Sequence, residues 1–112
     1  MELNISSRSQ GDHTIVIASG EIDLYTAPRL HRELVDVLAD DRPAHVIVDM
    51  SGVVFCDSTG MNVLLSSLRR ARERGGRLEL AAPRAAVRKI LQVTGLDSLF
   101  TVLDESVAAS GQ

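Results

Sequence analysis

The segment Phe55–Gly60, with the sequence FCDSTG, places one carboxylate and two hydroxyls side by side just before an apolar run. Asp57 and Ser58 are residue types that begin helices, because their side chains accept hydrogen bonds from the first free backbone N–H groups. If Asp57 is the N-cap, Ser58 lies in the first helical turn with its hydroxyl pointing outward. Gly60 would then let another surface approach the backbone closely. An outward hydroxyl at a helix start is a candidate for phosphorylation.

A phosphoryl group on Ser58 would add about −1.5 to −2 charges to this turn. The helix N-terminus tolerates such an anion, because its backbone N–H groups carry a partial positive charge. Asp57, and Asp23 if it lies nearby, would repel the group and make the surface strongly anionic. The fold would change little, but docking onto a partner with an acidic or apolar surface would be lost. Taken without context, however, the same residues favour the simpler interpretation of an ordinary helix start.

Apolar residues at every second position predict strands, and apolar residues three and four apart predict helices. On this basis, strands are expected at residues 3–6, 14–18, 46–48, 77–80 and 100–103. Helices are expected to begin at Thr26, after Asp57, at Pro83 and, as a short C-terminal helix, at Asp104. The first two strands should form an antiparallel hairpin, and the later alternation of strands with helices predicts parallel pairing. The fold class expected is therefore α/β, with a mixed, mostly parallel sheet of four to five strands, an N-terminal β-hairpin and flanking helices.

Two polar turns follow strands in this scheme, at residues 20–23 and 49–59, and both are expected to lie outside the sheet. In open α/β sheets, functional sites gather where the carboxyl ends of strands turn into helices. The turn at 20–23 leads to Thr26, a suitable N-cap, and Tyr25 is spaced to pack on Leu30 as a hydrophobic staple. The ends of the three main helices are expected at residues 40–43, at Gly75-Gly76 and at Gly95.

The composition is that of an ordinary globular protein, with 112 residues, of which 45% are hydrophobic and 24% charged. This length suits a single domain spanning residues 1–112. No apolar run reaches the roughly 18–20 residues of a membrane span, and the N-terminal residues lack the pattern of a signal peptide, so a cytoplasmic location is expected. A net charge of −3 and an aromatic content of 3% argue against direct binding of nucleic acid.

Residue types that often bind metals or act as nucleophiles give weak signals in this chain. The single cysteine, Cys56, excludes an internal disulfide and a cysteine-cluster metal site. No histidine or basic residue adjoins Cys56 to lower its pKa, so a buried structural thiol is expected. His13, His31 and His45 show no pair at metal-ligand spacing and are expected to be solvated or capping residues. Neither a metal ion nor any other cofactor is therefore expected.

Three segments together resemble a known family, namely residues 20–28 (GEIDLYTAP), 46–50 (VIVDM) and 55–60 (FCDSTG). In this order and at these separations they are similar to the STAS domain of bacterial anti-sigma factor antagonists, and the similarity covers nearly the whole chain. The resemblance implies a small domain that binds an anti-sigma factor with serine kinase activity. The unphosphorylated form would capture this kinase and free the sigma factor. Phosphorylation would end the contact until a serine phosphatase restores the protein, as in the partner switching that regulates transcription during stress.

The resemblance also assigns roles to residues of this chain. The phosphorylated residue, the first hydroxyl of the Asp-Ser-Thr-Gly motif, is Ser58, and Thr59 is a second possible acceptor. The partner-binding positions that it implies are Glu21, Asp23, Tyr25, Asp57, Thr59, Gly60, Met61 and Asn62. Cys56 stands where a larger apolar residue is frequent, and Met61-Asn62 replaces a more usual Leu-Gly, which bears on the partner that is recognised. No catalytic residue, nucleic-acid contact or membrane contact is implied.

Three other functions are alternatives to that of an antagonist. An enzyme is not indicated, because Ser58 lacks the Gly-x-Ser-x-Gly context and the chain has neither a P-loop nor a dinucleotide fingerprint. A two-component receiver domain would use Asp49 as its phosphoacceptor, but it needs a lysine after the last central strand. The only lysine, Lys89, falls inside the third expected helix. A STAS subunit that regulates a transporter or a larger stress-signalling assembly would share the fold, and fold alone does not separate it from an antagonist.

Overall fold

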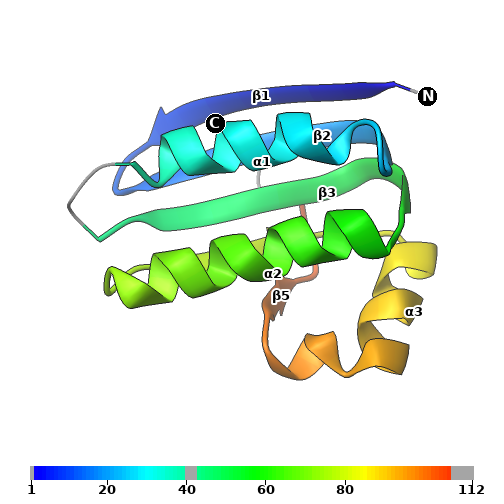
Figure 1. Ribbon diagram of the computed structural model, residues 1–112. Coiled ribbons are helices and arrows are strands. Elements are labelled where there is room, and N and C mark those ends of the chain that lie inside the picture. Colours follow the sequence, from blue (N-terminus) through cyan, green and yellow to red (C-terminus); the bar gives the residue numbers. More distant parts are fainter. Residues whose placement is uncertain (1, 40–42, 107–112) are drawn as a thin grey trace.

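The computed structural model describes residues 2–39 and 43–106 and contains, in these residues, a sheet in the order β1-β2-β3-β4-β5 (Figure 1). The elements are β1 (Leu3–Gln10), β2 (His13–Ile22), α1 (Ala27–Val37), β3 (His45–Cys56), α2 (Ser58–Glu73), β4 (Arg77–Ala81), α3 (Ala85–Thr94), the 3-10 helix η1 (Leu96–Ser98) and β5 (Thr101–Leu103). The strands β1 and β2 form an antiparallel hairpin, and all later neighbours pair in parallel. The expected fold class is confirmed.

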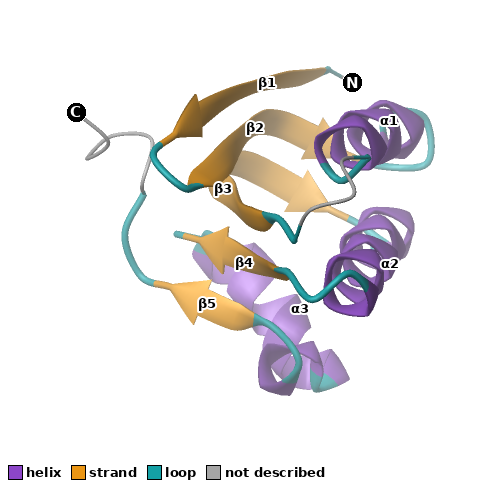
Figure 2. Cartoon of the chain, turned by 90° about the vertical axis from the view of Figure 1, so that its left-hand side faces the viewer, coloured by secondary structure: helices purple, strands orange, loops and turns teal. Residues whose placement is uncertain are grey.

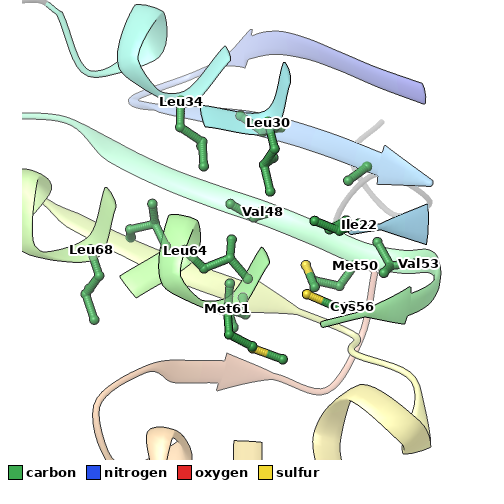
Figure 3. Packing of buried hydrophobic residues seen from close by; sticks show 14 of the residues in the cluster. Ile22, Leu30, Leu34, Val48, Met50, Val53, Cys56, Met61, Leu64 and Leu68 are labelled. Atoms are coloured by element: carbon green, nitrogen blue, oxygen red, sulfur yellow. The ribbon is translucent and has the colours of Figure 1, made fainter. Parts of the chain in front are cut away.

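The helices α1 and α2 lie side by side across one face of the sheet (Figure 2). Each turns an apolar stripe inward, with Leu30 and Leu34 on α1 and Leu64 and Leu68 on α2 (Figure 3). These residues repeat at intervals of four, so they lie on one side of a helix. They pack on alternate residues of the central strands, such as Val48. The core between the sheet and the helices therefore holds the start of each helix in a fixed place.

The central strand β3 is buried from Val46 to Met50, in agreement with the expectation for the run at residues 46–48. A strand covered on both faces is made of apolar, β-branched residues rather than of an alternating pattern. Asp49 is the polar exception in this stretch, and its carboxylate accepts hydrogen bonds from the Ser51 amide at 3.0 Å and from the Ser51 hydroxyl at 2.7 Å. The Ser106 hydroxyl donates to the other carboxylate oxygen.

The two turns expected outside the sheet are mostly strand, and this expectation is wrong. β2 continues to Ile22 and β3 to Cys56, and their last residues pair with each other in parallel, Ile22 opposite Cys56. Two register shifts, at Ile17/Ser19 and at Gly20/Glu21, interrupt the ladder. A bulge adds a residue to one strand and breaks the period-two pattern of apolar residues. The strands predicted from that pattern are therefore shorter than β2 and β3. The extended pairing brings both polar turns to one place.

Several element boundaries also differ from the expectation. The predicted staple between Tyr25 and Leu30 is wrong, because the Tyr25 side chain is exposed. Helix α3 begins two residues after Pro83, at Ala85. Helix α1 ends at Val37, before the expected end at residues 40–43. Asp104 and Glu105 are in a bend and Ser106 is outside any helix; the part of the expected C-terminal helix at residues 107–112 lies outside the described residues. Gly95 ends α3 in the left-handed conformation (φ 77°), as expected.

Among the residues that the structure describes, no helix combines the length and the apolar character needed to cross a membrane.

Candidate functional site

Asp57 lies between the end of β3 and the start of α2 and caps the helix. Its backbone is extended (φ −89°, ψ −173°), and its Oδ1 accepts a hydrogen bond from the Gly60 amide at 3.1 Å. The Met61 amide donates to the Asp57 carbonyl at 3.0 Å, which is the first turn of the helix. The expectation that Asp57 could serve as the N-cap, with Ser58 in the first turn, is confirmed.

Ser58 is the first residue of α2, and its side chain is exposed, whereas Thr59 is half-buried. Within residues 2–39 and 43–106, no hydrogen bond involves the Ser58 hydroxyl. An enzyme can therefore reach this oxygen without unfolding the helix. The free N–H groups of the first turn and the helix dipole would favour a negative charge here, while the adjacent Asp57 carboxylate would oppose it.

Gly60 seats the start of α2 on the ends of β2 and β3. A Cβ atom at this position would lie 2.5 Å from Cγ2 of Ile22 and 2.7 Å from Sγ of Cys56. The close approach expected at Gly60 is thus made from within the chain, by two buried core residues. A larger side chain would push the helix away from the strands. The glycine thereby fixes the position of Ser58, two residues earlier.

Asp23 organises the turn between β2 and α1. Its Oδ1 accepts hydrogen bonds from the Tyr25 amide at 2.9 Å, from the Thr26 amide at 3.0 Å and from the Thr26 hydroxyl at 3.2 Å. The hydrogen bond from the Thr26 amide is the main cause that lowers the pKa of the Asp23 carboxyl, with the Tyr25 amide and the Thr26 hydroxyl adding to it against the desolvation of the group. With only 7% of Asp23 exposed, this carboxylate serves as a structural anchor.

The two turns are adjacent because their strands end together. The Asp57 amide donates to the Ile22 carbonyl at 3.0 Å, so Asp57 and Asp23 each follow directly on one of two paired residues. The carboxyl ends of two parallel strands thus meet the starts of α1 and α2, which is the place where α/β sheets carry their sites. Thr26 occupies the N-cap position of α1, as expected, but its hydroxyl donates back to the Glu21 carbonyl at 2.8 Å instead of capping the helix.

The predicted site residues differ in how far they are exposed to solvent. Ser58, Asn62 and Tyr25 are exposed, and Tyr25 keeps 83% of its surface. Glu21, Asp57 and Thr59 are half-buried. Asp23, Gly60 and Met61 are buried, and the Met61 side chain points into the core (Figure 3). The buried residues shape the surface from below, and direct contact with another molecule would fall to the exposed and half-buried ones.

Three exposed apolar residues at the same end of the sheet were not singled out from the sequence. Leu24 is 64% exposed, Val54 52% and Phe55 44%. Together with Tyr25 they form what we call the apolar rim (Leu24, Tyr25, Val54 and Phe55). Phe55 lies opposite Glu21 in the paired ends of β3 and β2. The sequence did hold a signal for these exposed residues. The row of apolar residues directly before the Asp-Ser-Thr-Gly motif contains more residues than the core buries. Large apolar side chains left in water mark surfaces that bind other proteins.

Cys56 is not placed to act as a nucleophile, and Asp49 is not placed to act as a phosphoacceptor. Burial, with a smaller effect of the Asp57 charge, raises the pKa of the Cys56 thiol to about 12, so this group is a protonated core residue and not a nucleophile. The prediction of a structural thiol is confirmed. Asp49 is fully buried and held by Ser51 and Ser106, so its carboxylate is not presented as the phosphoacceptor of a receiver domain would be.

With this geometry established, comparison with protein families matches residues 4–109 to the STAS domain. The chain belongs to the STAS domain family. The match spans nearly all of the described residues, from β1 to β5. The family resemblance based on the three sequence segments is confirmed.

Several of the proteins to which this STAS chain is similar are named as anti-sigma factor antagonists. The anti-sigma-B factor antagonist of Staphylococcus aureus (strain NCTC 8325 / PS 47) is 28% identical over 102 residues, which are 91% of this chain and 94% of the relative. The crystal structure of an anti-sigma factor antagonist from Mycobacterium paratuberculosis is 29% identical, with a TM-score of 0.82 over 91% of this chain and 86% of the other. The Bacillus cell fate determinant SpoIIAA, solved in its phosphorylated form, has the same fold at 19% identity, with a TM-score of 0.71 over 88% of this chain and 90% of that one.

Proposed function

We propose that this chain is a single-domain anti-sigma factor antagonist of the cytoplasm that is controlled by phosphorylation at Ser58. Unphosphorylated, it binds an anti-sigma factor that is also a serine kinase, and the sigma factor is released. The observation that carries the proposal is the position of Ser58, exposed as the first residue of α2 beside the Asp57 cap and at the same sheet end as the apolar rim.

The docking surface of this proposal combines the apolar rim with polar groups around Ser58. Burial of the rim side chains against a partner supplies favourable free energy, because it removes apolar surface from water. Half-buried Glu21, which pairs with Phe55, and exposed Asn62 in the first turns of α2 would supply hydrogen-bonding groups. The fold holds this surface ready, because both turns are fixed by backbone hydrogen bonds. Binding therefore needs little ordering of the chain.

Phosphorylation in this proposal acts on the contact and not on the fold. A phosphoserine at position 58 would stand at the N-terminus of α2, where the helix accepts an anion. A partner that covers it would have to strip water from a group carrying about −1.5 to −2 charges, which costs far more than the burial of a hydroxyl. The Asp57 carboxylate next to it adds repulsion against any acidic partner surface. The names of the relatives, and the existence of SpoIIAA in a phosphorylated form, support this assignment.

Kinase assays with matched alanine variants test the choice of acceptor. The protein, Ser58→Ala and Thr59→Ala are incubated with ATP, Mg²⁺ and an anti-sigma factor kinase that the unmodified protein captures in a pull-down, and phosphate is counted by intact mass. The protein and Thr59→Ala should each gain one phosphate, and Ser58→Ala none. Modification of Ser58→Ala with loss of it in Thr59→Ala would move the site to Thr59.

Binding measured on the same variants tests the switch. Ser58→Ala should bind the kinase as tightly as the unmodified protein, and the phosphorylated protein at least about tenfold more weakly, given that hydrogen bonds to charged groups and desolvation contribute more than about 1.4 kcal/mol. Equal affinity before and after phosphorylation would reject the proposed function.

A further inference from the structure

The strands β2 and β3 begin on the left in Figure 1, whereas α2 begins on the right. A second cluster of polar side chains lies where these two strands begin. One potential ligand atom from each of Asp12, His13 and His45 lies within 4.8 Å of the others. Asp12 belongs to the tight turn between β1 and β2, where Gln10 pairs with His13. His45 is the first residue of β3. Strand pairing thus brings together His13 and His45, which show no metal-ligand spacing along the sequence.

The hydrogen bonds in this cluster set the protonation of its members. Nδ1 of His13 lies 3.2 Å from Oδ1 of Asp12, and since a carboxylate accepts, Nδ1 donates and Nε2 keeps its lone pair. The two His rings lie near each other, with ring centroids 5.4 Å apart. An anionic oxygen and an imidazole lone pair are therefore available together.

His45 is oriented by Glu79 of the neighbouring strand β4. Its Nε2 lies 2.7 Å from Oε1 of Glu79, and both side chains are largely buried. With Nε2 donating to the carboxylate, Nδ1 carries the lone pair of the ring. A carboxylate that holds the second nitrogen of an imidazole is the arrangement by which metal sites fix their histidine ligands. This pair has the form of a supported ligand rather than of a solvated surface histidine.

The surroundings leave room for an ion and its water. An open cavity of 360 Å³ is lined by Asp12, His13 and His45, together with Pro43 and Val37. Arg77 lines an adjoining cavity with Asp12 and His45 and places Nη2 3.4 Å from Nδ1 of His45. At that length the contact is a weak one, and the exposed Arg77 side chain can move into solvent. The positive charge of this guanidinium opposes the binding of a cation.

We propose that Asp12, His13 and His45 bind a divalent transition-metal cation of the zinc class, with Glu79 as the residue that positions His45. Two imidazole nitrogens and one carboxylate oxygen are a donor set that Zn²⁺ accepts, with water in the remaining position. Mg²⁺ and Ca²⁺ prefer sets made of oxygen alone. Ligand atoms around tetrahedral zinc stand about 3.3 Å apart, given bonds of about 2.0 Å. The Asp12 side chain is 96% exposed and is therefore free to rotate toward an ion, which would shorten the present separations.

Titration calorimetry of the full chain, without an affinity tag and freed of metal with a chelator, tests the proposal. Zn²⁺ should bind at one site per chain, and Mg²⁺ should not bind there. His13→Gln and His45→Gln should each weaken Zn²⁺ binding at least tenfold. His31→Gln is the matched control, because His31 is an exposed histidine on α1 outside the cluster, and it should bind Zn²⁺ as the parent chain does. Absence of Zn²⁺ binding by the parent chain, or an equal loss in His31→Gln, would overturn the proposal.

Variants of the two neighbouring residues separate a metal site from a structural contact. Glu79→Gln should weaken Zn²⁺ binding about 10- to 100-fold, as substitutions of such supporting residues do. Arg77→Gln should strengthen Zn²⁺ binding, because a positive charge leaves the site. Thermal unfolding in chelator checks that each variant folds, and added Zn²⁺ should raise the midpoint of the parent chain but not of His13→Gln. Unchanged affinity in both neighbouring variants would show that the ion binds elsewhere and would reject the assigned site.

Discussion

Asp23 and Asp57 have the same side chain and follow two strands that end together, yet their carboxylates hold different structures. Asp57 caps α2 through the Gly60 amide, which leaves Ser58 at the surface. Asp23 closes the turn before α1 by accepting from two amides and a hydroxyl. The residue types at both positions were noticed in the sequence because each is a turn former. Which hydrogen bonds they make depends on backbone geometry that the sequence pattern does not reveal.

The lowered pKa of Asp23 predicts how its contribution to stability depends on pH. A carboxyl that ionises more easily in the folded state stabilises the fold above its unfolded-state pKa, about 3.9, and this contribution is lost as the pH falls through the lower folded-state pKa. Asp23→Asn should therefore lower the urea midpoint at neutral pH, and the difference from the parent chain should shrink in acid. Asp36→Asn, an exposed carboxylate on α1, is the control. A difference that stays constant from neutral pH into acid would contradict the role assigned to the Asp23 charge.

At the scale of elements, the seating of α2 on β2 and β3 depends on the absence of a side chain at Gly60. Gly60→Ala should lower the free energy of unfolding by about 1–3 kcal/mol, because the added methyl group would overlap Ile22 and Cys56. This loss would occur although alanine favours a helix over glycine by about 1 kcal/mol. Asn62→Ala, an exposed position in the same helix, is the control and should change stability little.

A double-mutant cycle assigns the cause of that loss. Ile22→Ala removes the nearest atom, so Gly60→Ala should cost less in the Ile22→Ala background than in the parent chain. Urea denaturation of the four proteins measures the coupling. If the two changes are simply additive, the clash with Ile22 is not the reason for glycine at this position.

The sequence predicted most elements well, and its largest errors fall where pairing between distant strands, and not the local pattern, sets the structure. Helices were found from their four-residue apolar repeats, and the central strand from its β-branched run. The ends of β2 and β3 were missed because the bulges there break alternation, and only pairing with a distant strand supplies their hydrogen bonds. Phe55 was placed in a loop for the same reason, and of the apolar rim only Tyr25 was named from the sequence as a partner-binding residue. His13 and His45 lie on different strands, so their proximity is likewise a property of the sheet.

At the scale of the whole molecule, the Ser58 region and the His13 region occupy opposite ends of the same strands. His13 and Ile22 begin and end β2, which has 10 residues and therefore spans about 30 Å. Sites this far apart with no shared partner contribute independently to stability. Phosphorylation and metal binding would then be separate inputs to one rigid sheet.

Urea denaturation tests this independence without any ligand. The changes in unfolding free energy caused by His13→Gln and Ser58→Asp should add to within about 0.5 kcal/mol in the double variant. The measurement is made in chelator, so that bound metal does not contribute. A coupling well above that value would mean that strain passes along β2 and β3 from one end to the other.

The joint ending of β2 and β3 also determines what a kinase can recognise. Asp23 and Asp57 are far apart along the chain and become neighbours only when Ile22 pairs with Cys56. In the proposed function, the surface that a kinase would recognise around Ser58 is therefore built from two chain segments and not from one. A short synthetic peptide with the sequence FCDSTG would present the serine without its second segment, and it should be a poor substrate and a poor competitor for any enzyme that reads the folded surface.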